Sequence, residues 1–268
     1  MNLRIESIYV LLGLLIGCTA PPSDPIPKHQ SFEIKSSILG ETRVLCIWTP
    51  PGYEDSGESY PVLYMPDGGI REDFPHIANT LAGLVAAGTV PPMILVGIEN
   101  TERRRDLTGP SKVEADGEIA PTSDGSSKFR AFIADELFPE VGRRYRTTEQ
   151  RSIIGESAAG LFVVETLFLQ PELFSVYIAM DPAIYWNDSY LVRSAAKHLR
   201  KLPEDEICFW FAGSSVVDIQ PHTRELAKIL ESEAPERLDW IYSDEPGEEH
   251  STIFRATKKK AMTWALGR

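Results

Sequence analysis

The chain has 268 residues, and its 27 Lys and Arg against 39 Asp and Glu give a formal charge of −12 at pH 7. Nucleic-acid-binding proteins concentrate positive charge, so this balance argues against nucleic acid as a partner. With 43% hydrophobic and 25% charged residues, the composition is typical of one soluble globular domain. It argues against a disordered, collagen-like or multi-span membrane chain.

The first residues have the pattern of a targeting segment. The uncharged run Ile8 to Ile16 is shorter than the roughly 20 residues that cross a bilayer, and it is typical of a secretory signal. The run ends in Leu15-Ile16-Gly17-Cys18, which resembles the lipobox of bacterial lipoproteins. We therefore expect a signal peptide over 1–17, lipidation of Cys18, and a flexible Pro-rich tether over 18–30. Plain secretion and a buried N-terminal helix are the alternatives.

Apolar or β-branched runs bounded by Pro, Gly or Asp predict eight strands, separated mostly by helical stretches. The expected strands are Ser31 to Ile38, Arg43 to Thr49, Val62 to Met65, Met93 to Ile98, Ser152 to Ile154, Val176 to Met180, Ile207 to Ala212 and Leu238 to Tyr242. The expected helices are Asp73 to Ala87, Ser127 to Val141, Ala158 to Phe168, Ser189 to Lys201, Pro221 to Ser232 and Ser251 to Leu266.

This order of elements predicts the fold class. The first two strands have no helix between them, which favours an antiparallel hairpin around Leu39-Gly40-Glu41. The middle strands are nearly all apolar, as parallel strands covered by helices on both faces are. We therefore expect a single α/β domain over 31–268, a mostly parallel doubly wound sheet whose ligand site lies at the carboxyl ends of the strands. The polar stretch from Glu99 to Ser126 is long enough to be a functional or mobile loop.

One tight turn carries a candidate nucleophile. In Gly155-Glu156-Ser157-Ala158-Ala159-Gly160 a short apolar strand meets an apolar helix through small residues, which is the setting of the G-x-S-x-G nucleophile elbow. Such a turn lifts the hydroxyl of Ser157 above the sheet and leaves the backbone N–H of Ala158 facing a developing oxyanion. Ala159 stands where the pattern has glycine, and Gly160 follows it.

A nucleophilic serine needs a base, and in this fold the base follows it in the chain. Three histidines follow Ser157, and His250 lies in the turn after the last predicted strand, at the carboxyl edge of the sheet. His198 falls within a predicted helix beside Lys and Arg, as a surface residue would, and His222 opens a helix, where it could act as a cap. The sequence therefore favours His250 as the base.

The orienting acid is less well determined. Asp218 follows the strand that ends at Ala212, and its spacing from Ser157 and His250 leaves room for one βα unit on each side. Asp181, directly after the preceding strand, and Glu225 are the alternatives.

A second oxyanion donor is expected from the loop after the third strand. Gly68 and Gly69 follow Asp67 there, and backbone without a side chain can approach a ligand closely.

Together these segments resemble the putative esterase (esterase D-like) family of the α/β-hydrolases, which includes S-formylglutathione hydrolases, feruloyl esterases, mycolyltransferases and enterochelin-type siderophore esterases. The matched segments span about 32 to 255, in the family's order. They are Tyr60 to Gly69 (oxyanion strand), Glu99 to Thr108 (N-T-x-R-x-R-D-x-T segment), Phe129 to Arg146 (helix before the nucleophile), Gly155 to Gly160 (elbow) and Glu249 to Ser251 (histidine turn).

The resemblance implies a serine esterase that forms an acyl-enzyme. Ser157 would be the nucleophile, His250 the base and Asp218 the acid, with the amides of Gly69 and Ala158 as the oxyanion hole. Relatives often have Ser-Pro where this chain has Asp181-Pro182, which places a spare carboxylate near the site. Some siderophore esterases of the family work with Ser and His and no clear acid.

The same resemblance implies a small-molecule ester as the partner and no metal or organic cofactor. Arg105, Tyr185 and Trp186 are candidate substrate-binding residues, although Arg105 could instead pair with Asp106 and neighbouring acids. A siderophore lactone, an acylated sugar and a xenobiotic ester all fit such a site. An acyltransferase and a catalytically silent binding protein are the alternative functions.

The three cysteines, Cys18, Cys46 and Cys208, are too few and scattered for a disulfide framework, and none lies in a zinc-binding pattern. Cys46 and Cys208 fall in strands that the middle of the sheet separates. We expect two buried thiols there rather than a bridge.

Overall fold

A computed structural model describes residues 24–268. The signal peptide predicted over 1–17, the lipidation site at Cys18 and the first part of the predicted tether lie outside the described residues. Among the helices of 24–268, none is long and apolar enough to cross a membrane.

The described residues form one eight-stranded sheet in the order β1-β2-β4-β3-β5-β6-β7-β8. Both β1/β2 and β2/β4 pair antiparallel, and every later pair is parallel. The strands are β1 (Gln30–Ser36), β2 (Glu41–Trp48), β3 (Tyr60–Pro66), β4 (Ile94–Ile98), β5 (Thr147–Glu156), β6 (Val176–Met180), β7 (Ile207–Gly213) and β8 (Leu238–Asp244). This is the α/β-hydrolase type of sheet that the sequence predicts.

Helices fill most of the connections. They are α1 (Tyr53–Ser56), α2 (Phe74–Ala86), α3 (Arg103–Leu107), α4 (Glu114–Ile119), α5 (Ser126–Phe132), the π-helical turn η1 (Ile133–Leu137), α6 (Phe138–Arg144), α7 (Ala158–Leu169), the 3-10 turn η2 (Pro171–Leu173), α8 (Trp186–Leu199), α9 (Gln220–Glu233) and α10 (His250–Leu266). All six predicted helices are present. The one predicted over 127–141 continues through η1 to Arg144.

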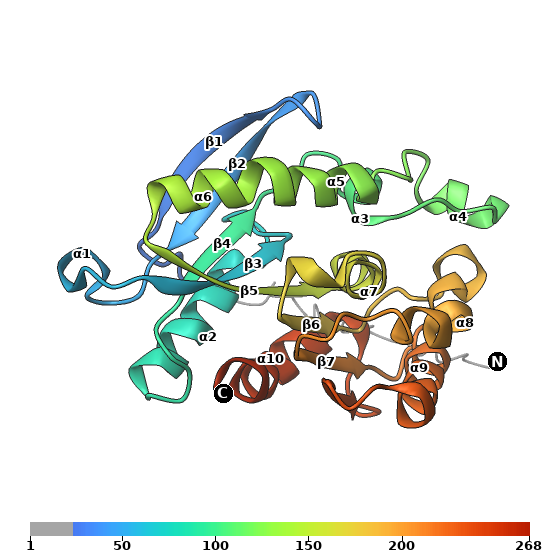
Figure 1. The fold of residues 1–268 in the computed structure, drawn as a ribbon. Helices are drawn as coiled ribbons and strands as arrows, with labels where there is room; N and C mark the ends of the chain where they lie inside the picture. Colours follow the sequence, from blue (N-terminus) through green and yellow to red (C-terminus); the bar gives the residue numbers. More distant parts are fainter. Residues whose placement is uncertain (1–23) are drawn as a thin grey trace, which may run out of the picture.

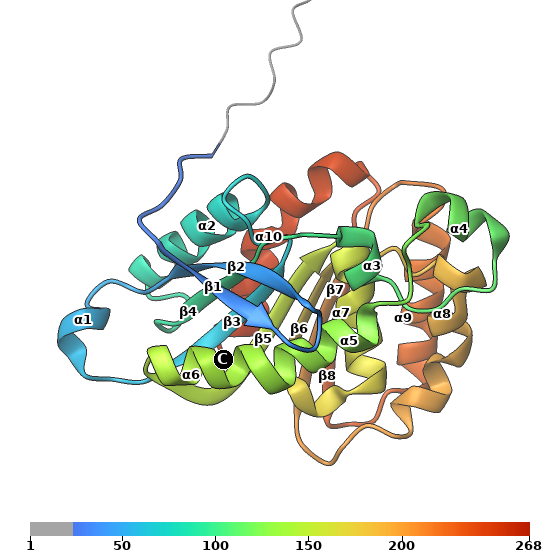
Figure 2. The same ribbon diagram turned by 90° about the horizontal axis from the view of Figure 1, so that it is seen from above.

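The sheet is covered on both faces, as Figures 1 and 2 show. Side chains of α5 to α9 pack on one face around Phe162 and Phe209, and α2 and α10 pack on the other around Phe74 and Met262. Helix α7 is buried almost all round, which explains why its sequence has no polar stripe. Burial from both sides holds the ends of β5 and β6 rigidly, and the candidate site is built on these ends.

The stretch from Glu99 to Ser126 is not a loop without secondary structure, and side-chain hydrogen bonds anchor it to the domain. It contains α3 and α4, and the carboxylate of Asp116 accepts hydrogen bonds from Ser111 Oγ (2.6 Å) and from the backbone N–H of Asn187 (2.8 Å). These contacts tie α4 to the beginning of α8, beside which it lies in both views (Figures 1 and 2).

The described end of the predicted tether contacts the domain. Asp24 forms an ion pair with Arg255 on α10 (2.6 Å), and Pro25 O accepts a hydrogen bond from Asn79 Nδ2 on α2 (2.8 Å). Among the described residues, Cys46 and Cys208 are buried free thiols, as predicted.

Candidate active site

The turn between β5 and α7 has the backbone of a nucleophile elbow. Ser157 adopts φ 57° and ψ −118°, a combination that L residues rarely take and that costs of order 1–3 kcal/mol. Close packing holds it there, because a Cβ on Gly155 would lie 2.7 Å from the backbone of Ala159 and one on Gly160 would lie 3.0 Å from Met180 O. The predicted turn is therefore present, and the Ala at 159 fits because Gly155 faces it.

The hydroxyl of Ser157 meets the imidazole of His250. The distance from Ser157 Oγ to His250 Nε2 is 3.0 Å. His250 is the first residue of α10, where Glu249 and Thr252 form a capping box that fixes the entry of the chain into the helix. The backbone of Glu248 is held in turn, because its carbonyl accepts the N–H of Ser215 (2.9 Å) from the loop after β7.

The other ring nitrogen of His250 contacts Asp181. The distance from Nδ1 to Asp181 Oδ2 is 2.6 Å. Since an ionised carboxylate only accepts, Nδ1–H donates, and in the neutral ring Nε2 is left to accept the hydroxyl of Ser157. The three side chains therefore form one chain of hydrogen bonds from Oγ to a carboxylate with 0% exposure.

Asp181 is itself held by Ser214, which follows β7. The backbone N–H of Ser214 donates to Oδ1 (2.7 Å) and its hydroxyl donates to Oδ2 (2.8 Å). These bonds compensate the burial of the carboxylate and fix its orientation. Reasoning from sequence missed Ser214, although its place directly after an apolar strand, at the carboxyl edge, was a signal that could have pointed to it.

The acid favoured from the sequence needs correction. Asp218 lies exposed in the turn before α9, and the carboxylate that contacts His250 is Asp181, one of the two alternatives. Glu225, the other, lies exposed on α9 and pairs with Lys228 (3.2 Å). The physical reason is that the chain after β6 turns sharply at Asp181 (φ 44°), so the acid comes from the strand next to β5 rather than from the following βα unit.

The remaining histidines lie elsewhere. His198 was expected at the surface, but it is buried and stacks on Phe168 with the ring centroids 5.4 Å apart. Nδ1 of His222 lies 2.9 Å from Ser189 Oγ.

The two predicted oxyanion amides differ in their surroundings. Ala158 is the first residue of α7, where an N–H has no partner within the helix and the positive end of the helix dipole lies. The N–H of Gly69 instead donates to the carboxylate of Glu72 (2.7 Å). The N–H of Ala158 therefore has no partner within its own helix, whereas the N–H of Gly69 is occupied by a side chain.

Two ionisable groups beside the nucleophile have displaced pKa values. The hydrogen bond that His250 donates to Asp181 raises the pKa of His250 above its usual 6.5, with burial opposing the shift. Burial, reinforced by Asp73, raises the pKa of Glu156 to about 8. At neutral pH the carboxyl of Glu156, next to Ser157 in the chain, is therefore largely protonated.

An Arg–Asp pair lies at the end of β3. Arg103 Nε and Nη2 donate to the two oxygens of Asp67 at 2.7 Å each, and Asp67 Oδ1 also accepts from Asn100 Nδ2 (2.5 Å). Asp67 has φ 56°, so the loop that carries Gly69 leaves the strand abruptly.

The predicted substrate-binding residues fare differently. Arg105 donates to Glu41 Oε1 (2.6 Å) and Asp106 Oδ1 (2.7 Å), which is the structural pairing that the sequence left open. Trp186 is buried, with its indole N–H donating to Gly109 O (3.0 Å), so it anchors the stretch before α4 rather than presenting its ring to a substrate. Tyr185 is only partly buried against the core.

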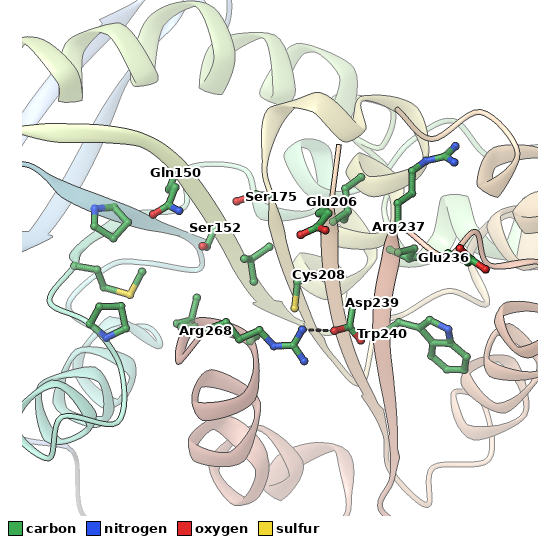
Figure 3. Close-up of a pocket in the computed structure, with 18 residues that line it drawn as sticks. Gln150, Ser152, Ser175, Glu206, Cys208, Glu236, Arg237, Asp239, Trp240 and Arg268 are labelled. Atoms are coloured by element: carbon green, nitrogen blue, oxygen red, sulfur yellow. Dashed lines mark hydrogen bonds and ion pairs between the residues drawn. The ribbon is translucent and has the colours of Figure 1, made fainter. Parts of the chain in front are cut away.

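A cavity of about 650 Å³ lies at the amino ends of the strands, away from the carboxyl ends that carry Ser157 and Asp181. Figure 3 shows it among the amino ends of β6, β7 and β8, with the thiol of Cys208 and the ion pair between Arg268 and Asp239 beside it. None of Ser157, His250 and Asp181 lines it. Within 24–268 no group of three or more His, Cys, Asp or Glu side chains is arranged to hold a metal ion.

Comparison with known proteins agrees with this geometry. The profile of the family described as Putative esterase matches residues 36–263. The chain belongs to this family. It is 27% identical to the ferri-bacillibactin esterase BesA of Bacillus subtilis over 77% of this chain and 79% of that protein. It is also 27% identical to the siderophore triacetylfusarinine C esterase of Aspergillus fumigatus, over 65% of this chain and 62% of that one.

A solved structure supports the same grouping. The IroE-like serine hydrolase from Shewanella oneidensis superposes with a TM-score of 0.82 and 27% identity, covering 88% of this chain and 79% of that one. The protein is thus a carboxylic ester hydrolase with the α/β-hydrolase fold, and the identification from the sequence is confirmed.

Proposed function

We propose that this esterase works through an acyl-enzyme formed on Ser157, with His250 as the base and Asp181 as the orienting acid. The observation that supports the proposal is the continuous contact from Ser157 Oγ to His250 Nε2 (3.0 Å) and from His250 Nδ1 to Asp181 Oδ2 (2.6 Å). Hydrogen-bond reach between nucleophile and base, with the base oriented by a third group, is what this chemistry requires.

The reaction proceeds in two acyl transfers. Ser157 Oγ attacks the ester carbonyl while His250 Nε2 takes its proton, and the buried carboxylate of Asp181 stabilises the imidazolium. Nε2 then gives the proton to the leaving alcohol. Water attacks the acyl-enzyme while His250 Nε2 takes its proton. The bond from Oγ to the acyl carbon then breaks, Nε2 returns the proton to Ser157 Oγ, and the carboxylic acid leaves.

The oxyanion is held by the amide of Ala158, reinforced by the N-terminus of α7. The loop after β3 supplies the second donor through Gly69. Because β3 and β5 are neighbouring parallel strands, their carboxyl ends bring this loop and the elbow to the same edge of the sheet.

The proposed substrate is a small-molecule ester of the siderophore type. Relatives named for ferri-bacillibactin and triacetylfusarinine C support this class. The proposed location is the bacterial cell envelope, with Cys18 lipidated and no membrane contact beyond that anchor. Labelling with a palmitate analogue tests the anchor: we expect label in the wild type and none in Cys18→Ser, and an unlabelled wild type would refute it.

A panel of chemically different esters tests the function. It holds a short-chain nitrophenyl ester, a catecholate and a hydroxamate siderophore ester, and an acylated sugar, each incubated with the wild type and with Ser157→Ala. We expect the wild type to hydrolyse the nitrophenyl and siderophore esters and the variant to lose both activities. Product analysis with added alcohols separates hydrolysis from acyl transfer. Turnover that survives Ser157→Ala would contradict the proposed nucleophile.

A further inference from the structure

Glu72 occupies the amide that the resemblance to known esterases assigns to the oxyanion hole. Its Oε2 accepts the N–H of Gly69 at 2.7 Å, and Glu72 N–H donates back to Gly69 O at 3.0 Å. The missing side chain at Gly69 permits this contact, since a Cβ there would lie 2.9 Å from Oε2. The carboxylate and the amide therefore form a closed turn.

The other oxygen of Glu72 is also held. Oε1 accepts from Asn100 Nδ2 at 2.8 Å, and the same Nδ2 donates to Asp67, which Arg103 holds with two hydrogen bonds. Burial raises the pKa of Glu72, and the hydrogen bonds from Gly69 and Asn100 oppose that shift. Glu72 remains partly exposed, so its side chain has a way out to solvent.

An oxyanion and a carboxylate cannot share this amide. The N–H of Gly69 is a single donor, and a negative oxygen brought next to Glu72 would be repelled by it. The oxyanion hole gains its effect from donors that already point at the developing charge, and here one of the two points at the protein's own side chain.

We propose that Glu72 is an autoinhibitory gate of the oxyanion hole: it occupies the Gly69 amide in the free enzyme and turns away when an ester carbonyl takes its place. The inference rests on the proposed Ser157 esterase and adds a resting state to it. Part of the binding energy of the substrate then goes into displacing Glu72. Esters that make many contacts with the enzyme are therefore favoured over small generic esters.

Substitution of Glu72 tests the gate. We expect Glu72→Ala to raise kcat/KM for a short-chain nitrophenyl ester about 10-fold, because a hydrogen bond to a charged group is strong enough for a change of that size. Glu72→Gln keeps the shape and can still accept from Gly69 without the charge, so we expect a smaller rise. Binding of a boronic acid that mimics the tetrahedral intermediate should tighten in the same order.

Two controls accompany this test. The first shows whether removing any carboxylate changes the activity, and the second shows whether Ser157 is the nucleophile. Glu225→Ala removes one exposed carboxylate that pairs with Lys228 on α9, and we expect its kcat/KM to match the wild type. Labelling of Ser157 by a fluorophosphonate in the wild type shows whether the nucleophile itself holds, independently of Glu72. The gate is refuted if Ser157 is labelled and a folded Glu72 variant has a kcat/KM equal to or below that of the wild type. If Glu72→Ala does not fold, Glu72→Gln decides.

Discussion

The Asp181→Asn substitution tests the acid that the structure places against His250. The amide oxygen of Asn can go on accepting the N–H of Ser214, as Asp181 Oδ1 does at 2.7 Å. Its NH2 group then faces His250 Nδ1, where a carboxylate oxygen stood at 2.6 Å. Two donors cannot face each other, so the neutral ring carries its proton on Nε2 and has no lone pair for the hydroxyl of Ser157.

The expected loss is large because the base is held in the wrong tautomer. Replacing this carboxylate by an amide in another Ser-His-Asp enzyme lowers the rate by about 10⁴-fold, which corresponds to about 5.5 kcal/mol of activation free energy. We expect kcat/KM of Asp181→Asn for a nitrophenyl ester to fall by that factor. The matched variant Asp218→Asn, at an exposed position, should stay within about twofold of the wild type.

The pH profile provides a second measurement on the same variants. Catalysis needs neutral His250, so wild-type kcat/KM falls as the pH drops through the pKa of this histidine. That pKa lies above 6.5, chiefly because of the hydrogen bond to Asp181. Without that carboxylate, the acidic limb of the remaining activity should move to lower pH. A large loss in Asp218→Asn, with Asp181→Asn near wild-type activity, would refute the assignment.

Three further predictions concern the surroundings of the nucleophile. The Glu156→Gln variant should gain stability relative to the wild type as the pH rises from 6 to 9. The folded wild type holds the Glu156 proton up to a pKa of about 8, so its free energy of unfolding falls as the pH rises toward that value. Melting temperatures that change equally with pH in the two proteins would disprove this prediction. Gly155→Ala should lose about 1–3 kcal/mol in urea unfolding, because its Cβ meets the backbone of Ala159 at 2.7 Å; a wild-type midpoint would contradict the close packing. Ser214→Ala removes one donor from buried Asp181 and should lower kcat about 10-fold, whereas full activity would show that the backbone N–H suffices.

The strands could be predicted from the sequence because burial leaves a strong local signal. Val176–Met180 and Ile207–Gly213 are uninterrupted apolar runs, and their bounds differ from the predicted ones by at most a residue. The contact between Ser157 and His250 could also be predicted, since each residue directly precedes a predicted helix at the carboxyl edge of the sheet.

What the sequence could not determine depends on contacts between distant segments. Nothing in the spacing shows that Asp181 turns back at φ 44° toward His250 while Asp218 stays in an exposed turn. The position of helix α4 cannot be predicted from the sequence either, because it depends on Asp116 accepting the N–H of Asn187, 71 residues away. The contact of Glu72 with Gly69 is local, but glycine at 69 indicates only that something approaches closely, not which side chain does.

A fluorophosphonate probe reports whether the hydroxyl of Ser157 is a nucleophile activated by His250, on which the proposed reaction depends. The wild-type protein, the Ser157→Ala variant and the His250→Ala variant are treated with the probe, and the labelled peptide is mapped by mass spectrometry. We predict one label on Ser157 in the wild type, none at that peptide in Ser157→Ala, and labelling slowed at least about 100-fold in His250→Ala. A folded wild type that stays unlabelled, or that is labelled on another residue, would contradict this role of Ser157.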